Sequence, residues 1–205
     1  MTTDKQVIDR VSRGFSSSAF DTDGKLHGRL AALAEQEGIL DVSYRTIDSP
    51  VGPLLLAATV EGLVRVAFSR EDHDSVLASL ATDISPRILR TPRRLDEATR
   101  QLEEYFARKR RAFTVPIDLR LAHGFRRSVL LHLRDIPYGE TESYTLVAKA
   151  AGNPSAVRAA ASACSHNPLP LVVPCHRVVR SDGTPGEYRG GPEAKRVLLD
   201  MEAAR

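Results

Sequence analysis

The nonapeptide Leu171-Val172-Val173-Pro174-Cys175-His176-Arg177-Val178-Val179 places a cysteine and a histidine side by side between two apolar runs. Pro174 fixes its own φ and has no backbone N–H, so the chain enters Cys175 with little freedom. Cysteine is a nucleophile as the thiolate, and a neighbouring proton acceptor such as His176 makes that form more available. The competing interpretation is a structural cysteine beside an incidental histidine, because free cysteine commonly packs as a small apolar side chain. The surrounding sequence decides between the two.

Further short blocks accompany this nonapeptide in a fixed order. They are Ile136-Pro137-Tyr138-Gly139-Glu140, Ser143-Tyr144, Ala151-Gly152-Asn153-Pro154, Arg158, Asn167-Pro168 and Gly186-Glu187-Tyr188-Arg189-Gly190-Gly191. With Pro-Cys-His-Arg-Val at 174–178, they resemble the O6-alkylguanine-DNA alkyltransferases, the methylated-DNA–protein-cysteine methyltransferases. The resemblance is dense over about 125–202 and looser back to about 41. It implies DNA repair by direct reversal: an alkyl group leaves O6 of guanine, and also O4 of thymine, and stays permanently on a cysteine.

The resemblance implies roles for individual residues in that transfer. Cys175 is the expected alkyl acceptor, and His176 is expected to take the thiol proton through water. Glu202 matches the family's acidic residue that orients this histidine. Asn167 matches the asparagine that bonds the backbone and braces the active-site turn, although a simple turn asparagine would look the same. Tyr144 matches the tyrosine that hydrogen-bonds N3 of the guanine and supplies the proton of the leaving group.

Contacts with the rotated-out base and with DNA are also implied by the resemblance. Tyr188 is expected to line the base pocket, while backbone groups of Cys175, Val178 and Arg189 hold O6 and the exocyclic amine. Many relatives carry a smaller residue at the position of Arg189, whose side chain could reach a phosphate or narrow the entrance. The residues expected to contact DNA are Tyr144, Ser155, Ala156, Arg158 and Ser162.

Two short helices around Gly152 predict a helix-turn-helix. Ser143 is expected to cap the first, at 144–151, and Asn153-Pro154 to supply the N-cap and first position of the second, at 155–165. In the second helix only Arg158 is long and polar, so it can distinguish few base pairs. Its small residues favour close, sequence-tolerant binding in the minor groove, unless they serve only helix packing. The resemblance implies that Arg158 fills the gap left by the extruded nucleotide, and extrusion is required because a stacked base is inaccessible.

Hydrophobic periodicity divides the chain into three parts. We predict a partly ordered extension at 1–40, an N-terminal sheet-and-helix domain at 41–118, and a C-terminal DNA-binding and alkyl-acceptor domain at 119–205. The fold class is therefore α/β (α+β), and the resemblance implies a ribonuclease-H-like N-terminal domain before a mostly helical domain with the helix-turn-helix. The expected strands are 42–46, 54–59, 63–68 and 113–117, the first three as an antiparallel meander. The expected helices are 26–37, 74–81, 92–109, 144–151, 155–165 and 190–202, with another from 121 that ends before 135.

Composition narrows the partners and cofactors. The 205 residues are 42% hydrophobic and 27% charged with a net charge of +3, which is compatible with a polyanionic partner but does not demand one. Cys164 and Cys175 fit no zinc spacing, and the histidines do not cluster with them, so neither metal nor cofactor is expected. Apolar runs stay short of the ~20 residues of a membrane span, and the N-terminus does not resemble a signal peptide.

The expected partner is double-stranded DNA carrying O6-alkylguanine, bound by a cytoplasmic, nucleoid-associated monomer, with cooperative association on DNA left open. Three other functions compete with this one. A non-catalytic lesion sensor of the same fold would replace the nucleophile, often by tryptophan, but this chain has Cys175 and no tryptophan. A helix-turn-helix transcription regulator fits poorly with the alanine-rich second helix. A cysteine hydrolase would turn over, whereas an alkyltransferase retains a stable adduct.

Overall fold

The computed structural model describes residues 26, 28–91 and 93–203, and the chain divides into two compact units at 1–40 and 41–205. In the first unit, residues 28–36 are helical, which confirms the expected short helix. The predicted partial order of residues 1–25 lies outside the described residues. Everything that follows concerns the second unit.

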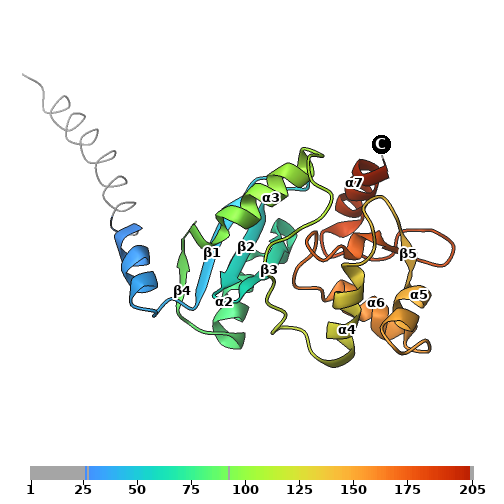
Figure 1. Ribbon diagram of the computed structural model, residues 1–205, viewed down its shortest axis with the longest axis horizontal. Helices are drawn as coiled ribbons and strands as arrows, with labels where there is room; N and C mark the ends of the chain where they lie inside the picture. Colours follow the sequence, from blue (N-terminus) through green and yellow to red (C-terminus); the bar gives the residue numbers. More distant parts are fainter. Residues whose placement is uncertain (1–25, 27, 92, 204–205) are drawn as a thin grey trace, which may run out of the picture. The chain divides into compact units, whose positions relative to one another are not determined.

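A four-stranded sheet forms the first half of this unit, with strand order β3-β2-β1-β4 (Figure 1). Strands β1 (Val42–Ile47), β2 (Leu54–Thr59) and β3 (Gly62–Phe68) pair antiparallel, which confirms the predicted meander. The fourth strand, β4 (Ile88–Arg90), pairs parallel with β1 and was not predicted. Its three residues are too short for a recognisable alternation, so only the pairing with β1 defines it.

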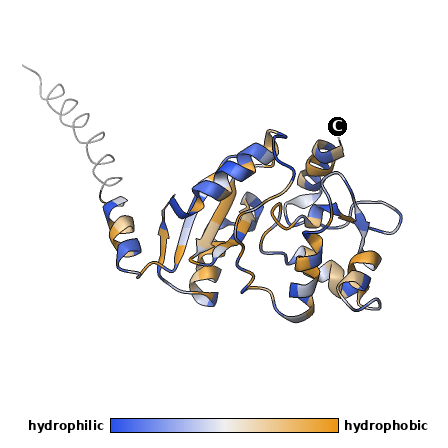
Figure 2. Cartoon of the chain, viewed as in Figure 1, coloured by the Kyte–Doolittle hydropathy of each residue, from blue (hydrophilic) through white to orange (hydrophobic). Residues whose placement is uncertain are grey.

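Helices cover both faces of the sheet. Alternate residues of β2 belong to two apolar clusters, one shared with α2 (His73–Asp83) and one with α3 (Asp96–Phe106) and the later helices. Figure 2 shows the largely hydrophobic strands and the hydrophilic outer side of α3. We refer to residues 42–106 as the sheet half and to residues 124–203 as the helical half.

Two predictions in this region were wrong in extent. The helix expected at 92–109 begins as a 3-10 turn at Arg93–Leu95 (η2) and ends at Phe106, because Arg108 adopts a positive φ of 59°. The strand expected at 113–117 is reduced to a single bridge between Ile117 and Leu63. Pro116 precedes that bridge and has no N–H to extend a ladder.

The helical half contains α4 (Gly124–Leu133), α5 (Tyr144–Ala150), α6 (Val157–Ser165) and α7 (Gly191–Ala203). Between them lie a two-stranded parallel pair, β5 (Glu142–Ser143) with β6 (Val178–Val179), and the 3-10 turn Cys175–Arg177 (η3). Another 3-10 turn, Ser69–Glu71 (η1), follows β3 in the sheet half. None of the described helices is long and apolar enough to cross a membrane.

The helix-turn-helix is formed by α5 and α6, and its capping was predicted in part. The Ser143 hydroxyl accepts a hydrogen bond from Leu146 N (3.3 Å), which confirms the expected cap, and Gly152 has the positive φ of 91° that ends a helix. The start of α6 at 155 was wrong, because Asn153 does not cap it. Its side-chain oxygen instead accepts a bond from the Ser155 hydroxyl (2.8 Å), and Ala156 is the N-cap residue.

Candidate active site

Cys175 is the first residue of η3 and is buried. Its Sγ accepts a hydrogen bond from Asn167 Nδ2 (3.1 Å), and the same nitrogen donates to Val173 O (2.8 Å). The side-chain oxygen of Asn167, Oδ1, accepts a hydrogen bond from Leu169 N (2.9 Å). The Asn167 side chain therefore connects the Cys175 sulfur to Leu169 and to Val173, at the two ends of the chain segment that leads to the cysteine. Burial raises the pKa of the Cys175 thiol to about 11, against the lowering effect of the Asn167 bond.

His176, the residue after Cys175, forms a buried pair with Glu202. The distance from His176 Nε2 to Glu202 Oε1 is 2.9 Å, and both side chains are almost wholly inaccessible. Because a carboxylate only accepts hydrogen bonds, Nε2 carries the proton and Nδ1 holds the lone pair. Nδ1 has no hydrogen-bond partner within the described residues. This tautomer makes Nδ1 the basic atom of the site.

Arg177 neutralises the charge of Glu202. Its Nε donates to Oε2 (2.8 Å) and its Nη2 to Oε1 (2.9 Å), while Nη1 donates to the carbonyl of Ile136 (2.6 Å). Burial by itself would raise the pKa of Glu202, but the hydrogen bonds from His176 and Arg177 lower it below its ordinary range. Since the carboxylate charge is already balanced, burial dominates at the histidine and lowers the pKa of His176. The imidazole is thus a neutral proton acceptor.

Two further residues of this network come from outside the sequence motifs. Tyr105 of α3 donates to Glu202 Oε1 (2.6 Å), so the sheet half contributes directly to the site. Lys195 of α7 is fully buried, and its Nζ donates to Val178 O (2.6 Å). Its positive charge favours a Cys175 thiolate, while burial lowers the pKa of the lysine. Sequence reasoning missed both, although Lys195, like Glu202, interrupts the apolar residues on the inner face of α7.

Tyr144 and Tyr188, the two tyrosines expected to contact the base, are both at least partly buried. Tyr144 is half-buried at the start of α5, and a Cβ on Gly186 would collide with its hydroxyl. Burial raises the pKa of Tyr144 to about 12, so it remains a proton donor. Tyr188 is buried edge-on to the His176 ring, with 6.2 Å between ring centroids. Arg189, next to it, is ion-paired with Glu71 of the sheet half.

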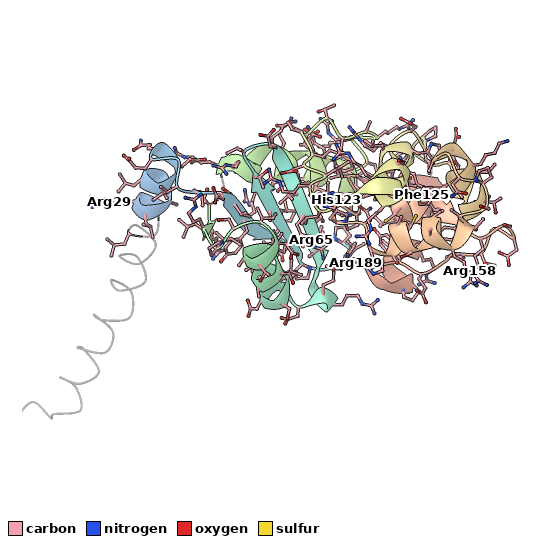
Figure 3. All side chains as sticks on the ribbon, turned by 90° about the horizontal axis from the view of Figure 1, so that it is seen from below. Arg29, Arg65, His123, Phe125, Arg158 and Arg189 are labelled. Atoms are coloured by element: carbon pink, nitrogen blue, oxygen red, sulfur yellow. The ribbon has the colours of Figure 1, made fainter. Side chains whose placement is uncertain are left out.

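Apart from the half-buried Tyr144, the predicted DNA-contacting residues lie on the outer side of the helical half. Arg158, Ser155 and Ser162 are exposed and Ala156 is partly exposed, and Figure 3 shows Arg158 pointing away from the sheet half. The inward face of α6 carries small buried residues packed in the core, so close packing does explain that face: Ala160, Ala163 and Cys164. The outward face is available to a ligand.

The described residues contain no group of three or more histidine, cysteine, aspartate or glutamate side chains that could hold a metal ion. Cys164 and Cys175 are both free and buried. Fold and site together describe a two-part protein in which a helix-turn-helix lies beside one buried cysteine with a histidine–glutamate pair.

Comparison with known proteins identifies the family. The "6-O-methylguanine DNA methyltransferase, ribonuclease-like domain" matches residues 42–119, and the "6-O-methylguanine DNA methyltransferase, DNA binding domain" matches residues 124–204. These two matches span most of the chain. The chain belongs to the 6-O-methylguanine DNA methyltransferase family.

Individual proteins that resemble this chain carry names of the same family. The methylated-DNA–protein-cysteine methyltransferase of Mycobacterium bovis is 38% identical over 164 residues, which cover 80% of this chain and 94% of the relative. A constitutive methylated-DNA–protein-cysteine methyltransferase of Bacillus subtilis is 37% identical over 160 residues, covering 78% and 94%. The crystal structure of Mycobacterium tuberculosis O6-methylguanine methyltransferase has a TM-score of 0.69 at 37% identity, covering 80% and 94%. The Mycobacterium tuberculosis protein in complex with DNA has a TM-score of 0.67 at 36% identity, covering 79% and 93%.

Proposed function

We propose that this protein repairs DNA by moving an alkyl group from O6 of guanine, and from O4 of thymine, onto Cys175, once per protein molecule. The Cys175 sulfur attacks the alkyl carbon, a C–S bond forms, and the bond from that carbon to O6 breaks with its electron pair on guanine. The thiol proton passes through water to His176 Nδ1. Tyr144 donates a proton to the leaving guanine. The product is a thioether, which is a poor leaving group, so the cysteine is consumed.

One observation carries this proposal: a buried sulfur, hydrogen-bonded by Asn167, next to a neutral histidine whose other nitrogen is held by Glu202. A buried thiol with a raised pKa is unreactive until its proton is removed, and the neighbouring imidazole supplies an acceptor. The reaction class, methylated-DNA–protein-cysteine methyltransferase, is the one that the names of the relatives give. A non-catalytic sensor would have no use for this nucleophile.

The DNA-bound state that we propose follows from the outward face of α6. Double-stranded DNA carrying O6-alkylguanine would lie against this helix through its minor groove, without sequence preference, and a monomer would bind it. Ser155, Ala156 and Ser162 allow close approach, and Arg158 would enter the base stack. Tyr188 and the backbone of Val178 and Arg189 would hold the extruded base. We also propose that the domain boundary lies at 118/119, after an extension at 1–40.

Mass spectrometry tests the proposed function. After mixing with duplex DNA that contains O6-methylguanine, each molecule should gain one methyl group in place of one hydrogen, on the peptide that contains Cys175. Unmethylated duplex of the same sequence is the control. An unmodified protein, or the loss of several methyl groups from DNA per protein molecule, would reject an alkyl acceptor that reacts once.

Arg158→Ala should slow the repair of duplex DNA by about 10–100-fold, because the arginine no longer offsets the few kcal/mol needed to unstack the nucleotide. The reaction with free O6-benzylguanine needs no unstacking and should change little. The measurement is the second-order rate constant for each substrate. Arg196→Ala, which removes an exposed arginine of α7, is the matched control. Equal slowing with both substrates would argue against the stacking role.

The pH profile should reveal His176 as the proton acceptor. Because burial lowers the pKa of His176 below its ordinary value of 6.5, the imidazole is neutral at and above that pH. As pH falls through the lowered pKa, the imidazole becomes protonated and the rate with O6-benzylguanine should fall. A His176→Gln protein should react about 10²–10⁴-fold more slowly. Its rate should keep rising toward alkaline pH, since only direct ionisation of the thiol remains. Parallel profiles in the two proteins would exclude His176 from this role.

A further inference from the structure

The end of β3 holds the turn that contains Asn167. The carbonyl of Pro168 accepts hydrogen bonds from Val66 N (2.8 Å) and from Arg65 Nη1 (3.4 Å). Arg65 is buried, with 6% of its surface exposed. One strand of the sheet half therefore fixes the residue that follows Asn167 in the cysteine site.

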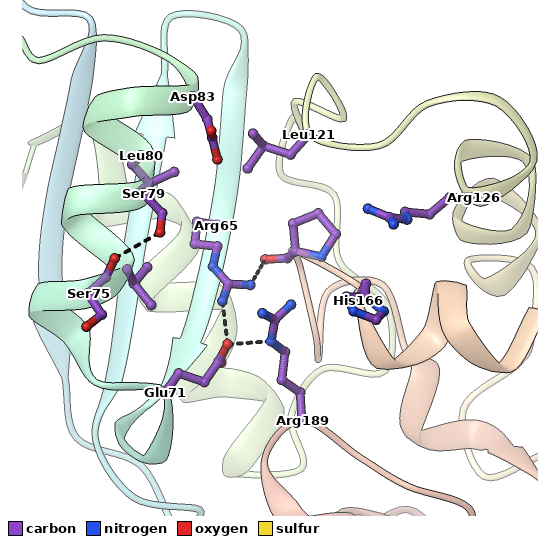
Figure 4. A pocket seen from close by; sticks show the side chains of 12 residues that line it. Arg65, Glu71, Ser75, Ser79, Leu80, Asp83, Leu121, Arg126, His166 and Arg189 are labelled. Atoms are coloured by element: carbon purple, nitrogen blue, oxygen red, sulfur yellow. Dashed lines mark hydrogen bonds and ion pairs between the residues drawn. The ribbon is translucent and has the colours of Figure 1, made fainter. Parts of the chain in front are cut away.

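Glu71, in the 3-10 turn η1 after β3, ties this strand to a second wall of the site. Its Oε1 accepts from Phe68 N (2.9 Å), and its Oε2 pairs with both Arg65 and Arg189 (Figure 4). The side chain of Glu71 is 9% exposed and that of Arg189 is 32% exposed. The guanidinium of Arg189 is thus engaged by a carboxylate and does not point to solvent as a free phosphate ligand.

The loop at 188–191 is closely seated on the same part of the sheet half. The rings of Tyr188 and Phe68 meet edge-on, with 5.5 Å between centroids. A Cβ on Gly190 would lie only 2.8 Å from the Phe68 ring, and Gly191 has a φ of 89° and packs against Arg70. A hydrogen bond from Gly191 N to Tyr188 O (2.9 Å) closes the loop. Its conformation depends on contacts with a strand more than a hundred residues earlier.

The Arg65–Glu71–Arg189 group borders a cavity of about 490 Å³ between the two halves. Arg126, His166 and Asp83 also line this cavity. Space therefore lies beside the loop into which Arg189 could move if its ion pair were lost. The ion pair with Glu71 is the charged contact that opposes this movement.

We infer that Glu71 is a positioning residue for the proposed alkyl transfer: through Arg189 it holds the loop at 188–191 in the conformation that receives the extruded base. The inference rests on the proposed function, in which Tyr188 and the Arg189 backbone hold that base. Without the Glu71–Arg189 ion pair, the loop at 188–191 would have to become ordered each time a base binds. The conformational entropy lost in that ordering would weaken binding of the base. The chemical step is spared, because no hydrogen bond or ion pair described joins Glu71 to Asn167, Cys175 or His176.

Arg189→Met tests this inference and leaves the buried Arg65–Glu71 pair intact, so the variant should fold. With free O6-benzylguanine, its half-saturating concentration should rise about tenfold while the maximal alkylation rate changes less than about twofold. Arg189→Lys, which retains a charge for Glu71, should recover part of the loss. Glu97→Gln removes an exposed ion pair of the same sheet half and is the matched control.

Hydrogen exchange provides a readout that does not require alkyl transfer. The Gly191 amide, bonded to Tyr188 O, should exchange about tenfold faster in Arg189→Met than in the parent and in Glu97→Gln. Faster exchange in Arg189→Met, together with a parent protein that is never alkylated, would support the positioning role of Glu71 and reject the proposed function. Unchanged exchange and an unchanged half-saturating concentration in Arg189→Met, with a parent protein that is alkylated, would overturn the positioning role of Glu71 alone. An equal fall in the maximal rate and in the second-order rate constant would also overturn it, since it would place Arg189 in the chemical step.

Discussion

A Cys175→Ser protein should leave the methyl group on guanine, with the rate of transfer reduced by more than about 10⁴-fold. A serine hydroxyl is a far weaker nucleophile than a thiolate, and His176 can do little to ionise it at neutral pH. The stability of the fold should change much less. Asn167 Nδ2 can donate to the serine oxygen as it does to Sγ, so no buried donor loses its partner.

Transfer of a labelled methyl group from duplex DNA to protein measures this effect, and a thermal melt checks the fold. The chain supplies its own control in Cys164, a second buried thiol that lies on α6 and contacts neither Asn167 Nδ2 nor the His176–Glu202 pair through any hydrogen bond described. Cys164→Ser should still accept one methyl group. If Cys175→Ser still accepted the label and Cys164→Ser did not, the methyl acceptor would be Cys164 and the proposed role of Cys175 would be wrong.

Sequence reasoning succeeded where structure depends on neighbouring residues. The cap at Ser143, the stop at Gly152 and the three-stranded meander follow from rules that act over a few positions. The start of α6 shows the limit of these rules, because the Asn153 side chain can form either of two local hydrogen bonds, one to the helix N-terminus and one to the Ser155 hydroxyl. It bonds Ser155 rather than the helix N-terminus, and the helix begins two residues later than predicted.

The residues of the candidate site could be predicted only where they lie in the short sequence motifs that carry the family resemblance. Tyr105 sits on the apolar stripe of α3, where the pattern indicates core, and its hydroxyl reaches Glu202 across 97 positions of sequence. Glu71 looks like an ordinary surface residue, and only the meeting of β3 with the loop at 188–191 shows that it pairs with Arg65 and Arg189. Such partners are set by tertiary packing, which no local pattern records.

Glu202→Gln should lower the free energy of unfolding by about 3–5 kcal/mol near neutral pH, because it leaves the buried Arg177 without its carboxylate. The amide can still accept from His176 Nε2, so the loss comes mainly from the uncompensated arginine charge. This is a large share of the 5–15 kcal/mol of an ordinary domain. Urea unfolding of the parent and the variant measures it.

The pH dependence of this difference has a definite sign. In the folded protein the pKa of Glu202 lies below its ordinary value of 4.5, so its contribution is present above that pH and is lost as pH falls through the lowered pKa. The stability gap between parent and Glu202→Gln should therefore narrow below about pH 4.5. A gap that stays constant down to strongly acidic pH would mean that the carboxylate charge is not what stabilises the site.

A double variant separates charge from packing. Glu202→Gln with Arg177→Met removes both buried charges and keeps similar volumes, so it should be more stable than Glu202→Gln alone. It should nevertheless remain slow in alkyl transfer, because a neutral glutamine cannot stabilise the His176 imidazolium as the carboxylate does. If the double variant recovered stability and full reactivity together, Glu202 would serve only to balance Arg177, and the orientation of His176 would need another source.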